Sequence, residues 1–156
     1  MFIQPQSDLH VDFKKYKIDY AVNENADVVV YAGDIGEDIA KNFDWMAKQL
    51  DGKTAIYILG NHEHYCKRFN DTIKEAHKEA KKYDNIHFLH NSAIQLDDVV
   101  FIGTTLWTDF NRENPTDMFV AQQMMSDFSV INYGSLRFLP HHSTQEHNLA
   151  IQHIKE

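Results

Sequence analysis

Two short apolar runs in the first half of the chain each end in a glycine followed by a polar residue. They are ADVVVYAGD, residues 26–34, and KTAIYILGN, residues 53–61. Such β-branched runs are typical of strands that are buried on both faces of a sheet. Between them, apolar residues recur at helical spacing: Ile39, Phe43, Met46 and Leu50. We therefore predict a helix over Glu37 to Leu50 between two parallel strands, which both end at the same edge of the sheet.

A second helical pattern follows these strands. It predicts a lysine-rich surface helix over Asn70 to Tyr83, with Asn70 as the N-cap and with Ile73, His77 and Ala80 on the inner side. We expect both helices to cover an outer face of the sheet. The fold class is therefore α/β.

The remaining segments predict shorter elements. IHFL, AIQLD and VVFIGT read as strands, and the last two form a hairpin that turns at Asp97 and Asp98. Ser143 or Thr144 opens a final helix that runs to the end of the chain. Pro5 removes one hydrogen-bond donor from the first strand, so we expect that strand to be bulged or to lie at a sheet edge.

The composition is that of one soluble domain spanning residues 1–156, with 43% hydrophobic and 24% charged residues. The sequence contains neither a secretory signal nor a long apolar span, so we expect a cytoplasmic protein without a membrane partner. A formal net charge of -8 and the lack of a basic block make nucleic acid an unlikely partner. The single cysteine, Cys66, excludes an internal disulfide, and we expect a buried or half-buried thiol.

Three polar clusters follow apolar runs, and they carry the candidate chemistry. They are SDLH (residues 7–10), GD (residues 33–34) and GNHEH (residues 60–64). Ligands of open α/β sheets bind outside the carboxyl ends of the strands, so we expect these clusters to converge there. The side chains concerned are Asp8, His10, Asp34, Asn61 and His62.

Oxygen and nitrogen donors without thiolate suit Mn, Fe, Zn or Ni. Asp8 and His10 would point to the same side of an extended segment, where they form a pair of ligands. The Asp34 carboxylate has two oxygens with which to bridge two divalent ions, and Asn61 adds a carbonyl oxygen. Two such ions can hold a hydroxide for attack on a phosphate ester, which leaves His62 to act on the leaving group.

SDLH, GDI and GNHEH together resemble the motifs of the calcineurin-like metallophosphoesterases, whose pattern is D-x-H, then G-D, then G-N-H-[DE]. The stretch IHFLHNSAIQLDDVVFIGTTLWTDF is similar to the middle of bacterial and phage members of that family. The resemblance implies a β-sandwich flanked by helices. It also implies that Asp8, His10, Asp34 and Asn61 are metal ligands, that Asp34 bridges and that His62 is catalytic. Glu63 and His64 would support the site, with Glu63 orienting an imidazole.

The sequence departs from this family beyond residue 110. The later Gly-His or Thr-His and G-H-x-H motifs are absent, so we expect a C-terminally incomplete fold that binds metal weakly and self-associates as a homo-oligomer. The later histidines are His141, His142, His147 and His153. We expect His147 and His153 to be exposed on the last helix, while the pair at 141 and 142 is a candidate for completing the site.

Three functions stay open at this point. The leading one is a metal-dependent phosphoesterase that hydrolyses a small phosphomonoester or phosphodiester. The second is a non-catalytic remnant that binds a metal or a nucleotide and acts through assembly with another chain. The third, a nuclease of the same family, is disfavoured by the acidic balance of charge.

Overall fold

The main sheet consists of parallel strands in the order β1-β2-β3-β4. The computed structural model describes residues 1–12 and 21–156. The strands are β1 (Ile3–Gln6), β2 (Val28–Ala32), β3 (Thr54–Ile58) and β4 (Ile86–Phe88). The predicted parallel pair is confirmed as β2 and β3. Pro5 lies in β1, which is an outer strand of this sheet, as its missing donor predicted.

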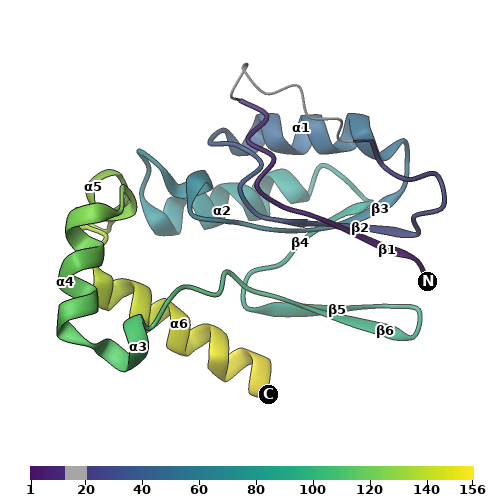
Figure 1. Ribbon diagram of the computed structural model, residues 1–156. Coiled ribbons are helices and arrows are strands. Elements are labelled where there is room, and N and C mark those ends of the chain that lie inside the picture. The colour runs from purple at the N-terminus through teal and green to yellow at the C-terminus, as the bar shows by residue number, and fades with distance from the viewer. Residues whose placement is uncertain (13–20) are drawn as a thin grey trace.

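Two helices cover one face of the sheet, α1 (Ile39–Leu50) and α2 (Phe69–Ala80) (Figure 1). Side chains alternate between the two faces of a strand, and Tyr31 and Tyr57 point into the helix-side core, where both are fully buried. Both predicted helices are confirmed, with small differences at their ends. Asp38 lies just before α1 and caps it by accepting a hydrogen bond from the Lys41 N–H at 3.1 Å.

The predicted cap of the second helix is wrong. Arg68 occupies the N-cap position of α2 without a side-chain hydrogen bond, and Asn70 lies inside the helix, where it is exposed. The inner face of α2 includes Ala76, whose small side chain is fully buried. His77, which the prediction placed on the inner side, is exposed, and only the edge of its ring contacts Phe88.

A hairpin covers the opposite face of the sheet (Figure 1). Its strands are β5 (Ser92–Leu96) and β6 (Val99–Gly103), which pair antiparallel. The predicted turn at Asp97 and Asp98 is confirmed. Val28 and Ile56 of the sheet pack against Phe101 and other apolar residues of the hairpin. The sheet is therefore buried on both faces, as the apolar runs predicted.

The C-terminal third of the described chain forms a helical layer beside the sheet (Figure 1). Its elements are α3 (Phe110–Glu113), α4 (Pro115–Met124), α5 (Asp127–Val130), the short strands β7 (Asn132–Tyr133) and β8 (Leu136–Arg137), and α6 (Pro140–Lys155). An aromatic cluster holds this layer together, and Phe69 of α2 stacks on Phe138 at its centre. α6 begins before the predicted start at Ser143, because Pro140 suits the first turn of a helix and the His142 ring accepts the Leu139 N–H.

Three expectations about surface residues are wrong. Cys66 is exposed, because its backbone takes a left-handed conformation with φ 59° in a surface loop. His147 is half-buried and its Nδ1 lies 2.6 Å from the carbonyl oxygen of Trp107. His153 is half-buried as well, and its Nε2 is buried.

Within residues 1–12 and 21–156, no helix combines the length and the apolar composition that a membrane crossing needs.

Candidate metal centre

Two glycines let the ends of β2 and β3 approach each other closely. Gly33 has φ 87°, and a Cβ on it would lie 2.6 Å from the backbone nitrogen of Gly60. A Cβ on Gly60 would lie only 2.1 Å from Oδ1 of Asp34. Any larger residue would therefore push the two strand ends apart or displace the Asp34 carboxylate. Glycine at both positions is what brings Asp34 to the loop that follows β3.

The segment after β1 reaches the same place through backbone hydrogen bonds. The Asp8 N–H donates to the Gly33 oxygen at 3.2 Å, and the His10 N–H donates to the Asp34 oxygen at 3.0 Å. Asp8 and His10 have φ of 55° and 43°, so the prediction of an extended segment is wrong. The physical reason is the turn of the backbone along the end of β2, which alternation in a strand does not describe.

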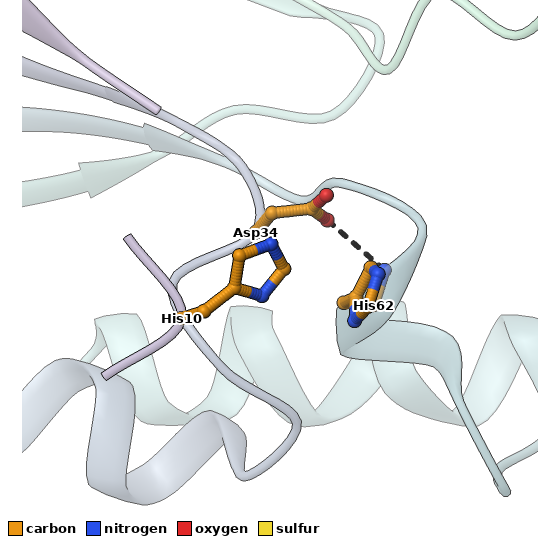
Figure 2. Close-up of side chains that lie close together, drawn as sticks. All are labelled: His10, Asp34 and His62. Carbon is orange, nitrogen blue, oxygen red and sulfur yellow. Dashed lines mark hydrogen bonds between the residues drawn. The ribbon is translucent and has the colours of Figure 1, made fainter. Parts of the chain in front are cut away.

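His10, Asp34 and His62 converge at this edge of the sheet (Figure 2). One ligand atom from each lies within 4.8 Å of the other two. The Asp34 Oδ1 accepts a hydrogen bond from the backbone N–H of His62 at 3.0 Å, which is the dashed line in Figure 2. The His62 ring meets the His10 ring edge-on, with 4.5 Å between the ring centroids, and stacks on Tyr65 at 4.3 Å. Packing therefore fixes the orientation of His62.

Asp8 is not one of these three residues, and the structure places it with Asn61 in an adjoining pocket. Both line a pocket of about 340 Å³ that also contains Asp34, so Asp34 belongs to both sets. Asp8 is exposed. The Asn61 amide nitrogen donates to the Tyr65 hydroxyl at 3.2 Å, and this contact does not use the carbonyl oxygen that a metal would need.

The His141-His142 pair lies at the start of α6. The His141 side chain borders a different pocket, beside Pro115 and Met118 of α4. The His142 ring is stacked on Tyr133, and its Nδ1 accepts the Leu139 N–H at 2.9 Å. The structure thus gives His142 a role in capping a helix, and neither histidine joins the group formed by His10, Asp34 and His62.

Glu63 holds the two loops of the site together. Its buried carboxylate accepts hydrogen bonds from the backbone N–H groups of Asp34 at 3.1 Å, Ile35 at 2.8 Å and Gly60 at 2.8 Å. The hydroxyl of Tyr57 donates to the same carboxylate at 3.0 Å. The prediction that Glu63 orients an imidazole is therefore wrong, because its partners are backbone amides and a phenol.

Burial sets the ionisation of the groups behind the site. Burial raises the pKa of Glu63, and the backbone N–H donors act against that shift. Burial and the nearby Glu63 raise the pKa of Tyr57 well above its usual value, so its hydroxyl keeps its proton. His64 stacks on Phe69 in the interior, and burial lowers its pKa to about 3. His64 is therefore a neutral packing residue in the support of the site.

Two residues at the site were missed by sequence reasoning. Tyr65 contacts Asn61 and His62, and its hydroxyl lies 3.5 Å from Oδ2 of Asp127. Burial, followed by the charge of Asp127, raises the pKa of Tyr65 to about 12. Asp127 is 4% exposed and lines the same pocket as Asp34. Asp127 lies far along the chain in α5, where the sequence pattern is weak, so no signal could have placed it here.

The donor set fits a divalent transition ion. It contains one carboxylate and two imidazoles, and thiolate is absent from the group. The second carboxylate oxygen of Asp34 is not used by the hydrogen bond to His62, so Asp34 can offer it to a cation. His10 and Asp34 are the residues that would hold such an ion, with Asp8 and Asn61 next to Asp34 in the adjoining pocket.

Comparisons with known proteins agree with this geometry. The model of the calcineurin-like phosphoesterase family matches residues 6–153. The chain is also 29% identical over 86 residues to "Uncharacterized protein L509" of Acanthamoeba polyphaga mimivirus, an alignment that covers 48% of this chain and 31% of that protein. The matched segment thus spans about a third of the relative's length. Because the family model covers nearly the whole chain, the protein belongs to the calcineurin-like phosphoesterase family.

Proposed function

We propose that this chain is a metal-dependent phosphoesterase that hydrolyses a small phosphomonoester or phosphodiester. The observation that carries the proposal is the convergence of His10, Asp34 and His62 at the carboxyl ends of parallel strands. Family membership supports the same chemistry, since members of the family are generally phosphoester hydrolases.

The proposed ligands are Asp8, His10, Asp34 and Asn61, and the proposed ions are Mn, Fe, Zn or Ni. Asp34 lies close to His10 and also lines the pocket that contains Asp8 and Asn61. This position supports a bridging role of Asp34 between two cations. When bound, such ions activate water, polarise a phosphoryl oxygen and neutralise the charge that develops at phosphorus.

Hydrogen bonds within the chain hold the residues of this site in place. Glu63 fixes the backbone at Asp34 and Gly60, and the His62 N–H fixes the Asp34 carboxylate. This pre-organisation lowers the cost of arranging ligands around a phosphate ester. The apolar and aromatic contacts of His62 hold its ring beside the same carboxylate.

We assign His62 to proton donation at the leaving oxygen. Its ring lies beside the Asp34 carboxylate and is held there by contacts with the rings of His10 and Tyr65, which supports this role.

The test compares two variants by metal content and by turnover of aryl phosphates with added Mn. Asp34→Asn should lose most bound metal and all turnover, because an amide is a weak ligand and cannot bridge. His62→Ala should lose turnover by a factor of about 100 or more and keep its metal, because one positioned acid contributes about 10² to 10⁴. His77→Ala, on the exposed side of α2, is the matched control and should behave like the native chain.

Loss of metal in His62→Ala would assign His62 as a ligand. Full turnover in His62→Ala would remove it from the reaction altogether. A native chain that binds at most one ion and hydrolyses neither class of ester would favour the alternative, a non-catalytic remnant that acts through assembly with another chain.

A further inference from the structure

The pocket beside Asp34 is lined by residues from two parts of the chain. The segments that follow the strands provide Asp8, Asp34 and Asn61. The segment 105–108, with Met125 and Asp127, provides most of the remaining lining. Leu106 and Met125 of this lining are large apolar residues, and they are 58% and 41% exposed. Apolar surface therefore stands open directly next to the proposed reaction centre.

The backbone that carries Leu106 is held at three points. The Thr105 hydroxyl donates to the Leu59 oxygen at 2.6 Å, and the Ser143 hydroxyl donates to the Thr108 oxygen at 2.9 Å. The ring of His147 contacts the Trp107 oxygen at 2.6 Å. With its neighbours anchored, Leu106 projects from a fixed support. A preformed apolar wall binds a ligand at a low cost in conformational entropy.

The charged groups of the pocket all have the same sign. The lining contains Asp8, Asp34 and Asp127, and neither lysine nor arginine lines it among the described residues. A phosphoryl group that lies at the proposed cations is neutralised there. A second phosphate on the same substrate would face the carboxylate of Asp127, which is not among the proposed ligands, and like charges in a partly desolvated site repel each other.

From these two features we infer the class of substrate: an ester of a single phosphoryl group whose alcohol part is neutral and has an apolar surface. The inference rests on the proposed function, because it places the phosphoryl group at Asp34. Leu106 and Met125 are its specificity-determining residues, and they contact the alcohol part. Asp127 selects against a second phosphate.

Phosphonates test this inference by binding alone, since a carbon–phosphorus bond is not hydrolysed by this chemistry. Calorimetry in the presence of Mn would compare methylphosphonate with 1-naphthylmethylphosphonate. We expect the naphthyl compound to bind about tenfold more tightly, because part of its ring surface is removed from water. The double variant Leu106→Ala, Met125→Ala should lose this preference and keep its affinity for methylphosphonate. Leu149→Ala, at a leucine on α6 that is 51% exposed, is the matched control.

The charge is tested with methylenebisphosphonate. The measured quantity is the ratio of its affinity to that of methylphosphonate, and this ratio should be about tenfold higher in Asp127→Asn than in the native chain. Chelation of Mn by the bisphosphonate in solution affects both proteins equally, so it does not change the comparison. Equal binding of the naphthyl and methyl compounds by the native chain would overturn the apolar assignment. An unchanged ratio in Asp127→Asn would overturn the charge assignment. Failure of every phosphonate to bind the Mn-loaded chain would instead contradict the proposed function itself, and this inference with it.

Discussion

At the scale of single residues, the tightest contact of the site is the one between Gly60 and the Asp34 carboxylate. A methyl group on Gly60 would meet Asp34 Oδ1 at 2.1 Å and its backbone nitrogen at 2.8 Å, so Gly60→Ala must shift one of the two loops. We expect a loss of unfolding free energy of about 1–3 kcal/mol, as for an overpacked core, together with weaker Mn binding. Urea unfolding and metal titration measure the two effects.

Gly134→Ala is the control for a glycine substitution that meets no neighbour. Unlike Gly60, Gly134 has a positive φ, 62°, and nothing lies within 4 Å of the added carbon. This variant should cost about 1 kcal/mol and leave Mn binding unchanged. If Gly60→Ala bound Mn as well as Gly134→Ala does, the close approach would not matter for the site.

A second prediction at the scale of single residues concerns the carboxylate of Glu63. In Glu63→Gln, one carboxylate oxygen becomes an amide nitrogen that faces backbone N–H donors, which leaves at least one buried donor unsatisfied. We expect a loss of about 2 kcal/mol in unfolding free energy. Chemical denaturation measures it, and Glu24→Gln, an exposed change of the same kind, should have no effect. A fully stable Glu63→Gln chain would contradict the role of Glu63 as the tie between the loops.

The sequence could predict that His10, Asp34 and His62 meet, because residues that follow parallel strands emerge at one sheet edge. Their chemical roles stay predictions. The left-handed backbone at Asp8 and His10 could not be predicted, since it depends on hydrogen bonds to the end of β2. The partners of Glu63 could not be predicted either, because they are backbone N–H groups, and every residue type except proline has one.

At the scale of elements, the N-terminus of α6 is capped by a hydrogen bond that depends on pH. The neutral ring of His142 accepts the Leu139 N–H through Nδ1, and burial, followed by the charge of His141, lowers the pKa of His142. Below pH about 6.5 the unfolded chain therefore binds more protons than the folded chain. Stability should fall as the pH drops from there through the lowered pKa, by about 1 kcal/mol for the loss of one cap.

His142→Gln keeps an acceptor at this third helical position and removes the titration. Its unfolding free energy, measured between pH 7 and pH 5, should therefore fall less than that of the native chain. His77→Gln on α2 removes an exposed histidine and is the control. Parallel pH profiles of His142→Gln and the native chain would show that the cap does not titrate in this range.

The elements differed in how far they could be predicted. The sheet, α1 and the hairpin could be predicted from the spacing of apolar residues within each segment. The start of α6 could not be predicted in this way. Its first turn contains Pro140 and depends on the hydrogen bond that the Leu139 N–H donates to the His142 ring. The helical layer from α3 to α5 depends on aromatic packing around Phe138, which comes from segments far apart in the chain.

At the scale of the whole molecule, the outer face of the hairpin predicts self-association. Val100 and Ile102 of β6 are 59% and 51% exposed, and within the described chain β6 pairs only with β5. Apolar strands with an open edge pair readily with other chains. We therefore expect a dimer of about twice 18.2 kDa in sedimentation at high protein concentration.

The double variant Val100→Lys, Ile102→Lys should stay monomeric under the same conditions, because charge on an edge strand opposes pairing. Leu136→Lys, a change at an exposed apolar residue in β8, is the control and should leave the dimer intact. A native chain that sediments as a monomer at every concentration would contradict the prediction.

The hydrogen bonds by which Glu63 joins the two loops also bear on the order in which the chain folds and binds metal. Many small metalloproteins stay unfolded until their ion arrives, because the ligands have no other reason to meet. Here backbone amides, a carboxylate and a phenol bring the loops together through hydrogen bonds within the chain. We therefore expect folding and metal loading to be separate steps. A folded chain would then take up its ion, lose it and bind another without passing through an unfolded state.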